Sequence, residues 1–209
     1  MLRLLILSLC ALLLGLTLAG YPAMATPEPP FTVKMMEGDF SVRDYPALIV
    51  AEVSVEGDRS SAASKGFRLL AGYIFGGNTR KASIAMTTPV LQEPAGGAKI
   101  VMTAPVLQSG GGKTWKVRFV MPEGSTLENL PKPISSKVRL LAQPRTQMAV
   151  VRFSGLIWPS TIAAKTAALE DFVRSHHLKS IGPASLAQYN PPWTLWFLRR
   201  NEVMIPVAP

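Results

Sequence analysis

Cysteine is almost absent from this chain of 209 residues, in which Cys10 is the only one. Cys10 lies in an apolar N-terminal segment that we expect to be removed, so the mature chain contains no cysteine. A mature protein without cysteine cannot form a disulfide bond, a thiolate metal site or a cysteine nucleophile.

Histidine is scarce too, and the motifs of common enzymes are missing. His176 and His177 are the only histidines, and they end a predicted helix, where the helix dipole favours an imidazolium. We interpret them as a capping or half-buried pair, and the alternative is an axial iron ligand or a metal site. Neighbouring helical side chains point about 100° apart, so the two do not suit a shared metal ion. The chain has no Gly-x-Ser-x-Gly, no metalloprotease helix and no Gly-rich phosphate loop. These absences favour a binding protein over an enzyme.

Residues 1–25 have the pattern of a secretory signal peptide. Arg3 supplies the positive start, residues 4–18 are apolar, and Ala23-Met24-Ala25 is a small-x-small cleavage site before Thr26. The alternative is an uncleaved membrane anchor, for which the apolar run is short. We therefore expect an exported, periplasmic protein.

The mature chain is strongly basic. Its formal net charge of +9 falls to +8 once Arg3 is removed. A basic exported protein can meet an anionic membrane surface, cell-wall polymers or carboxylated small molecules. We expect no nucleic acid partner, because export separates the protein from nucleic acid and the charges are scattered, and we expect a monomer. The proline-rich residues 26–37 are predicted to be an extended lead-in to one domain, residues 38–209.

The domain contains the same order of elements twice. In each half, two strand-like segments precede a segment with helical spacing, and further strand-like segments follow. The expected strands are residues 40–45, 48–55, 84–91, 100–107, 115–120, 138–141, 148–153, 185–189 and 195–205. The first helix is expected over residues 60–75 and the second from Ser160 as its N-cap. Their apolar faces are Ala63, Phe67, Leu70 and Ile74 in the first and Ile162, Leu169, Val173 and His176 in the second. This order predicts an α+β fold with a pseudo-two-fold internal repeat, in which two helices cover a curved antiparallel sheet.

Two short segments of the first half are nearly identical. Ile-Ala-Met-Thr-Thr-Pro-Val-Leu-Gln at residues 84–92 recurs as Ile-Val-Met-Thr-Ala-Pro-Val-Leu-Gln at residues 100–108. Each copy has a proline near the end of an expected strand. Proline cannot donate a ladder hydrogen bond, so each copy is expected at a sheet edge or a bulge.

The C-terminal run over residues 189–203 is dense in rigid and aromatic residues. It contains two prolines, Trp193, Trp196, Phe197 and the pair Arg199-Arg200. Such a run can build a flat apolar wall with a cationic end. That surface suits a planar ligand that carries carboxylates.

Several motifs together resemble the SOUL haem-binding protein family. They are the doubled Met-Thr-x-Pro-Val repeat, Trp-Lys-Val-Arg-Phe-Val-Met-Pro at residues 115–122, Leu-Pro-Lys-Pro at 130–133, Phe-Ser-Gly at 153–155 and Tyr-Asn-Pro-Pro-Trp followed by Arg-Arg-Asn-Glu at 189–202. The matches run from about Gly38 to Ile205. The resemblance implies a distorted antiparallel β-barrel with two helices about a pseudo-two-fold axis. It also implies non-covalent binding of haem or a related porphyrin.

The resemblance further implies a ligand groove between the first helix and the C-terminal run. The residues carried over to it are Phe67, Leu70, Ala71, Ile74, Pro192, Trp193, Thr194 and Arg199. Ordinary core packing is the alternative for the helix residues. For Arg199 and Arg200 the choice is between ligand carboxylates and either a solvated strand face or a structural pair with Glu202. Met86 and Met102 are either soft iron ligands or core filler.

We expect from this resemblance an exported protein that binds haem or another tetrapyrrole in a shallow apolar groove, for buffering, scavenging or delivery. Covalent attachment is excluded, because no Cys-x-x-Cys-His is present. Two other classes stay open. One is a protein- or membrane-interaction module with incidental tetrapyrrole affinity. The other is a binder of hydrophobic organic cations, which the charge of the chain disfavours.

Overall fold

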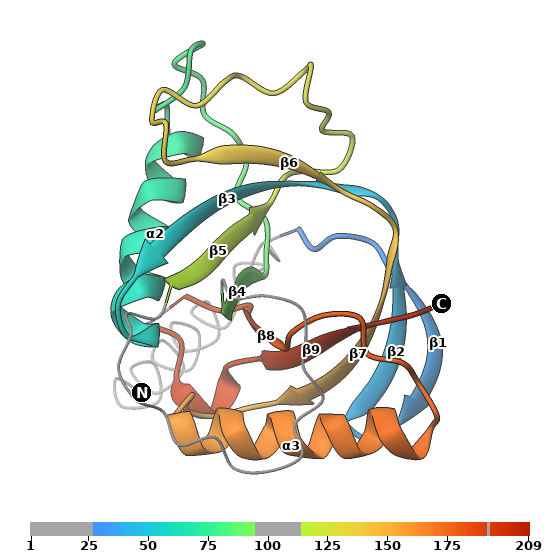
Figure 1. Cartoon of the computed structure of the whole chain (residues 1–209). Helices are drawn as coiled ribbons and strands as arrows, with labels where there is room; N and C mark the ends of the chain where they lie inside the picture. The colour runs from blue at the N-terminus through green and yellow to red at the C-terminus, as the bar shows by residue number, and fades with distance from the viewer. Residues whose placement is uncertain (1–26, 95–113, 192) are drawn as a thin grey trace, which may run out of the picture.

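Nine antiparallel strands form one sheet that curls round on itself, and two helices pack on its outer face (Figure 1). This computed structural model describes residues 27–94, 114–191 and 193–209. Along the sheet the strands follow the order β1-β2-β7-β9-β8-β4-β5-β3-β6. The elements are β1 (Thr32–Glu37), β2 (Phe40–Tyr45), β3 (Leu48–Glu56), α2 (Arg59–Ile74), β4 (Val90–Pro94), β5 (Thr114–Val120), β6 (Arg139–Gln143), β7 (Thr146–Phe153), α3 (Pro159–Ser175), β8 (Ser185–Gln188), the 3₁₀ turn η1 (Trp196–Leu198) and β9 (Asn201–Val207).

The predicted internal repeat is confirmed. The unit β2-β3-α2-β4-β5 recurs as β6-β7-α3-β8-β9. The two units contain equivalent strand pairs: β3 pairs with β5 in the first unit, and β7 pairs with β9 in the second. The units are joined by the pairing of β4 with β8. The α+β fold with two helices is therefore as the sequence predicts.

A long bent ribbon links the two halves. Phe40 pairs with Val151 in β2–β7, and Glu52 pairs with Arg139 in β3–β6. The residue numbers of each pair add up to the same total in both ladders. The segment β2–β3 therefore runs antiparallel to the segment β6–β7 without a shift of register between the two ladders. The ribbon bends at Pro46 and Pro144, where no N–H is available for the ladder. The sheet therefore curves as the predicted barrel does, but its strand order is open, with β1 and β6 as edges.

Each helix covers a separate apolar core on the outer face of the sheet. Leu70, Tyr73 and Ile74 of α2 pack on β3 and β5. Leu169 and Val173 of α3 pack on β7 and β9. Figure 1 shows the two helices on different sides of the curled sheet. The repeat therefore builds two similar layers, each with one helix on its half of the sheet.

The helix starts differ in how well the sequence predicts them. Asp58 caps α2, because its Oδ1 accepts a hydrogen bond from Ser61 N at 2.9 Å. The expected N-cap Ser160 is wrong: α3 begins at Pro159, with Trp158 as its N-cap residue. Proline suits the first helical position, since its φ is already helical and its missing N–H would have no partner there.

Three expected strands are placed differently or lie outside the described residues. The strand expected over residues 84–91 begins only at Val90. Residues 100–107 lie outside the described part of the chain. Residues 195–205 are not a single strand, because η1 precedes β9. The structure adds β1, which pairs with β2 and occupies the second half of the expected lead-in.

The inner face of the sheet holds a buried ionic cluster around Glu202. The Glu202 side chain is fully buried, and Arg43 binds it through two hydrogen bonds of 2.9 and 3.2 Å. Tyr189 donates to Glu202 Oε2 at 2.6 Å, and Arg200 reaches Oε1 at 2.9 Å. Burial alone would raise the pKa of Glu202, but the hydrogen bonds from Arg43 and Tyr189 and the two cationic charges hold it below its ordinary value. Glu202 is therefore an ionised group inside the protein.

A second cluster lies on the inner face of the other half. Glu52 accepts hydrogen bonds of 2.7 Å from both Arg118 and Arg139. These residues face each other directly across β5, β3 and β6, because Glu52 is in register with both arginines. Glu93 of β4 extends the cluster through Arg118 at 2.8 Å. Cross-strand ion pairs thus fix the register of this half from within.

Two glycines of α2 give a matched test of its packing. A Cβ on Gly66 would lie 2.6 Å from Val117 Cγ2, whereas a Cβ on Gly72 would meet nothing within 4 Å. We expect Gly66→Ala to lower the free energy of unfolding by about 1–3 kcal/mol, because overpacking outweighs the better helix propensity of alanine. Gly72→Ala should raise it by about 0.4–1 kcal/mol. Urea unfolding measures both, and equal effects from the two substitutions would contradict this packing.

The lowered pKa of Glu202 predicts a pH dependence. Its contribution to stability is fully present above about pH 4.3, its ordinary pKa, and is lost as the pH falls through the lower pKa of the folded protein. We expect Glu202→Gln to lower the free energy of unfolding by about 3–5 kcal/mol at neutral pH, because two cations lose their buried partner. The difference from the wild type should shrink in acid. Urea unfolding across pH, with the exposed Glu56→Gln as control, checks this, and a constant difference would contradict it.

Candidate functional site

The loop between β8 and β9 is held in place by its own hydrogen bonds. Thr194 N donates to Pro191 O at 3.0 Å, and Arg199 Nε donates back to Thr194 O at 2.8 Å. The η1 turn adds a bond of 2.9 Å from Leu198 N to Leu195 O. At the base of the loop, Arg200 N donates to the side chain of Asn190 at 2.6 Å. The chain therefore fixes this loop without needing to bury its side chains.

The side chains of this loop are apolar and exposed. Trp193 is 82% exposed and Trp196 is 56% exposed. Leu195, Phe197 and Leu198 are also more than half exposed, and we call residues 193–198 the aromatic loop. The rings of Trp196 and Phe197 meet edge to face, with centroids 5.5 Å apart. Exposed apolar residues in this number on one segment indicate a surface that binds something.

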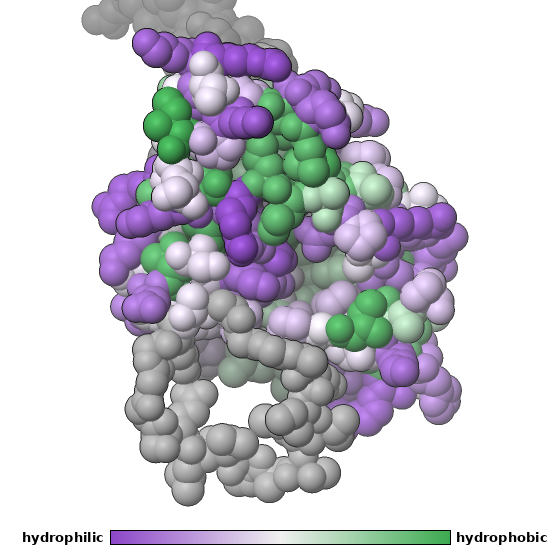
Figure 2. Space-filling view, turned by 45° about the horizontal axis from the view of Figure 1, so that its top comes forward, coloured by the Kyte–Doolittle hydropathy of each residue, from purple (hydrophilic) through white to green (hydrophobic). Residues whose placement is uncertain are grey.

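A second exposed segment lies beside the base of the aromatic loop. Leu156 and Trp158 join β7 to α3, and both are exposed. Asn201 at the start of β9 donates to Gly155 O at 3.1 Å, so the two segments leave the same end of the β7–β9 pair. Hydrophobic residues reach the surface elsewhere too: Figure 2 shows a patch of them framed by hydrophilic side chains.

The predicted site residues of α2 divide into two groups. Leu70 and Ile74 are in the core, with no surface open to a ligand. For these two residues the alternative of ordinary core packing is therefore correct. Phe67 is 39% exposed and lies edge-on to Phe119 at 5.3 Å, and Ala71 is half-buried. Phe75, 67% exposed, follows one turn later and was missed by sequence reasoning, although its spacing of four from Ala71 places it on the same side of the helix. The accessible stripe is therefore Phe67, Ala71 and Phe75.

Strand β4 connects the start of α2 to the start of the loop. Gln92 donates from Nε2 to Arg59 O at 2.8 Å, and Gln92 pairs with Leu186 of β8. The loop begins only a few residues after Leu186. In Figure 1 it runs at the lower left, on the side of the sheet where α2 begins. The start of α2 and the aromatic loop thus lie on the same side of the sheet, and Phe67 is the stripe residue nearest to that start along the helix.

The remaining predicted residues lie in or beside the loop. The hydrogen bond from Arg199 to Thr194 brings these two residues together, and Trp193 directly precedes Thr194. Pro192 lies outside the described residues. Arg200 is turned inward to Glu202 and Glu28, so the structural alternative is confirmed for this arginine.

His176 has structural partners. His176 is the C-cap residue of α3; its Nδ1 lies 3.0 Å from Phe172 O and its Nε2 3.2 Å from Glu37 Oε2. The cap interpretation is therefore confirmed for His176. Met86 packs partly buried against the α2 core, as core filler does, and Met102 lies outside the described residues. Within the described ranges, no three His, Asp or Glu side chains gather as a metal site would require.

No helix in the described part of the chain has both the length and the apolar character to cross a membrane.

Solved structures of similar fold support the architecture. The C-terminal domain of EcmrR matches with a TM-score of 0.57 and 12% identity, over 81% of this chain and 96% of that one. An uncharacterized conserved protein from Listeria innocua gives a TM-score of 0.55 and 13% identity, over 81% and 92% of the chains. A protein described as a hydrolase, also from Listeria innocua, gives 0.55 and 14%, with the same coverage. At such identities the likeness shows the fold alone.

The sequence comparisons identify a family. No curated protein gives a significant match. The family model described as SOUL heme-binding protein matches residues 26–206, which include both repeat units, α2 and the aromatic loop. The chain belongs to the SOUL heme-binding protein family.

Proposed function

We propose that this protein binds haem or a related tetrapyrrole non-covalently on the aromatic loop, against the accessible stripe of α2. The observation that carries the proposal is the exposure of Trp193 on a loop fixed by hydrogen bonds, in a chain whose family implies tetrapyrrole binding. A rigid exposed indole offers a flat apolar face at low entropic cost, which suits a planar macrocycle.

Each group of residues has a definite part in this proposal. Trp193 stacks on or edges against the macrocycle, and Phe67, Ala71 and Phe75 supply apolar contact from α2. In this proposal Arg199, which follows the loop and donates from Nε to Thr194 O, also pairs with a propionate, since guanidinium and carboxylate form strong charge-assisted hydrogen bonds. Leu70 and Ile74, which the sequence also suggested, support the helix from the core and do not touch the ligand.

Apolar contact supplies most of the affinity in this proposal. Burial of apolar surface is worth about 25 cal/mol per Å², less the cost of association. The fit to an iron ligand is poor, because His176 is engaged as a helix cap and neither histidine belongs to the aromatic loop or to α2. Haem bound here would bring its iron chemistry with it, while the protein holds and orients the ring. Such binding suits buffering, scavenging or delivery.

Export is part of the proposal. The apolar run and the Ala23-Met24-Ala25 site support a mature chain that starts at or near Thr26, in the periplasm. Mass spectrometry of the exported product gives its N-terminus. An intact Met1 on a membrane-bound product would contradict this part.

A substitution in the loop tests the proposed site. Trp193→Ala should weaken haemin binding about tenfold, equivalent to about 1.4 kcal/mol, because the exposed ring is lost. The fold should survive, since Trp193 contributes little to the core. The control is Ile134→Ala, which removes another exposed apolar side chain, from the segment between β5 and β6. Absorption titrations and circular dichroism measure both. A folded Trp193→Ala protein with wild-type affinity would place the site elsewhere.

The second candidate is a membrane-interaction module, favoured by the whole aromatic loop. Tryptophan and phenylalanine settle at the membrane interface, and a basic protein is attracted to anionic lipids. The same two variants decide between the candidates when sedimentation with anionic vesicles is measured alongside haemin titration. Loss of vesicle binding with unchanged haemin affinity favours the membrane module. Loss of haemin affinity without vesicle binding by the wild type favours the tetrapyrrole site.

A further inference from the structure

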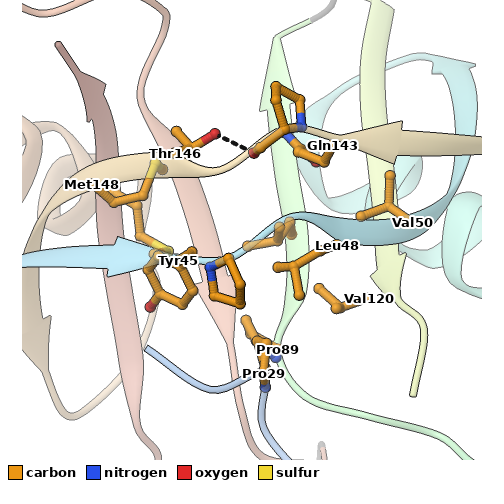
Figure 3. A pocket seen from close by; sticks show the side chains of 13 residues that line it. Pro29, Tyr45, Leu48, Val50, Pro89, Val120, Gln143, Thr146 and Met148 are labelled. Atoms are coloured by element: carbon orange, nitrogen blue, oxygen red, sulfur yellow. Dashed lines mark hydrogen bonds between the residues drawn. The ribbon is translucent and has the colours of Figure 1, made fainter. Parts of the chain in front are cut away.

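The inner face of the sheet contains a small apolar cavity of about 70 Å³. It lies where the long ribbon bends, so Pro46 and Pro144 both line it. Figure 3 shows Leu48, Val50 and Val120 on one side of the cavity and Tyr45 and Met148 on the other. The wall is therefore shared by both halves of the pseudo-two-fold repeat, and it is separate from the aromatic loop.

The proline-rich residues 27–31, which we call the strap, cross the mouth of this cavity. Pro29 forms part of the cavity wall. On one side of it, Pro27 O accepts a hydrogen bond from Thr88 N at 3.0 Å. On the other, the Phe31 ring lies under the Arg43 guanidinium at 4.6 Å and beside Tyr45 at 5.3 Å. The strap is thus attached at both ends while most of its residues stay exposed.

An ion pair holds the middle of the strap. Both carboxylate oxygens of Glu28 accept hydrogen bonds from Arg200 Nη1, at 2.8 and 3.0 Å. The side chain of Glu28 is 36% exposed, whereas that of Arg200 is 20% exposed. A partly exposed ion pair is weak and exchanges with other anions more readily than a buried one. This contact can therefore open without disturbing the core.

A second hollow of about 230 Å³ lies on the other side of the strap. The two hollows have Pro29, Pro46 and Leu48 in common as wall residues. If the strap moves aside, they join into one space close to the lower end of the roughly 300–1,000 Å³ range of small-molecule sites. Pro29 of the strap is one of the three residues that lie between the two hollows.

The charges around Glu28, which lines the second hollow, select the sign of a ligand. Arg43 and Arg200 face Glu202 and Glu28, so the group is neutral while the strap is in place. When Glu28 leaves with the strap, one positive charge is uncompensated next to the second hollow. Glu202 cannot attract a cation, because both arginines already neutralise it.

We propose that this cavity is an internal binding site for a small carboxylate with an apolar body, and that Glu28 occupies the position of the ligand carboxylate when the site is closed. The ligand carboxylate takes over Arg200 and its apolar part enters the joined space under the strap. The site is distinct from the proposed tetrapyrrole surface, so either can exist without the other.

Two probes with the same body and opposite charge test the proposal. We expect 4-phenylbutanoate, but not 4-phenylbutylamine, to bind in isothermal titration calorimetry. Glu28→Gln should tighten 4-phenylbutanoate binding about fivefold, because the competing carboxylate is removed. The matched control is Glu170→Gln on the outer helix α3, which should leave the affinity unchanged. Binding of neither probe to the wild type or the Glu28→Gln variant would overturn the proposal, as would equal binding of the amine or no effect of Glu28→Gln.

Methyl NMR locates the bound probe. The methyl signals of Leu48, Val50 and Val120 should shift on addition of 4-phenylbutanoate, and saturation with haemin should not prevent the shifts. Shifts confined to Leu195 and Leu198 of the aromatic loop would overturn the internal site and assign the probe to the tetrapyrrole surface.

Discussion

The single register of the long ribbon is the constraint on which the rest of this structure depends. Because β2–β3 and β6–β7 stay in step on both sides of Pro46 and Pro144, the two repeat units must face each other across a bend. That bend turns a flat arrangement of nine strands into a curled sheet with an inner and an outer face. The outer face takes the two helices, and the inner face takes the ion pairs and the cavity. A slip by one residue would exchange these faces.

The two faces have different chemical roles as a result. The outer cores hold α2 and α3 rigidly, so the accessible stripe of α2 and the aromatic loop are presented to solvent on a stable base. The inner face is fixed by charges: Glu52 is in register with its two arginines, and Glu202 binds Arg43 and Arg200. Arg200 links the two regions, since it ends the aromatic loop and enters the buried cluster. It thereby holds the loop to the inner face.

The sequence predicts the repeat, the helices and most strands, because apolar periodicity is strong wherever one face is buried. It fails where a tertiary contact decides the outcome. Phe67 shares the helical periodicity of Leu70 and Ile74, yet only the latter two are in the core, because close approach of Gly66 to Val117 rotates the buried face of α2. The run over residues 195–205 has apolar residues on both sides of a polar centre, so its pattern does not reveal that η1 precedes β9. The distant pairing of Arg43 with Glu202 leaves no local signal.

For the proposed site, the motifs indicated the C-terminal run and α2 but could not separate lining residues from supporting ones. The exposed fraction of each side chain separates the two groups: Trp193 and Phe75 are exposed and can line the proposed site, whereas Leu70 is buried and can only support it. The most direct test of the account is a comparison of haemin with metal-free protoporphyrin in absorption and fluorescence titrations of the mature protein. An apolar surface without a strong iron ligand predicts dissociation constants within about tenfold of each other. Binding of haemin alone, with a shifted Soret band, or of neither compound, would contradict it.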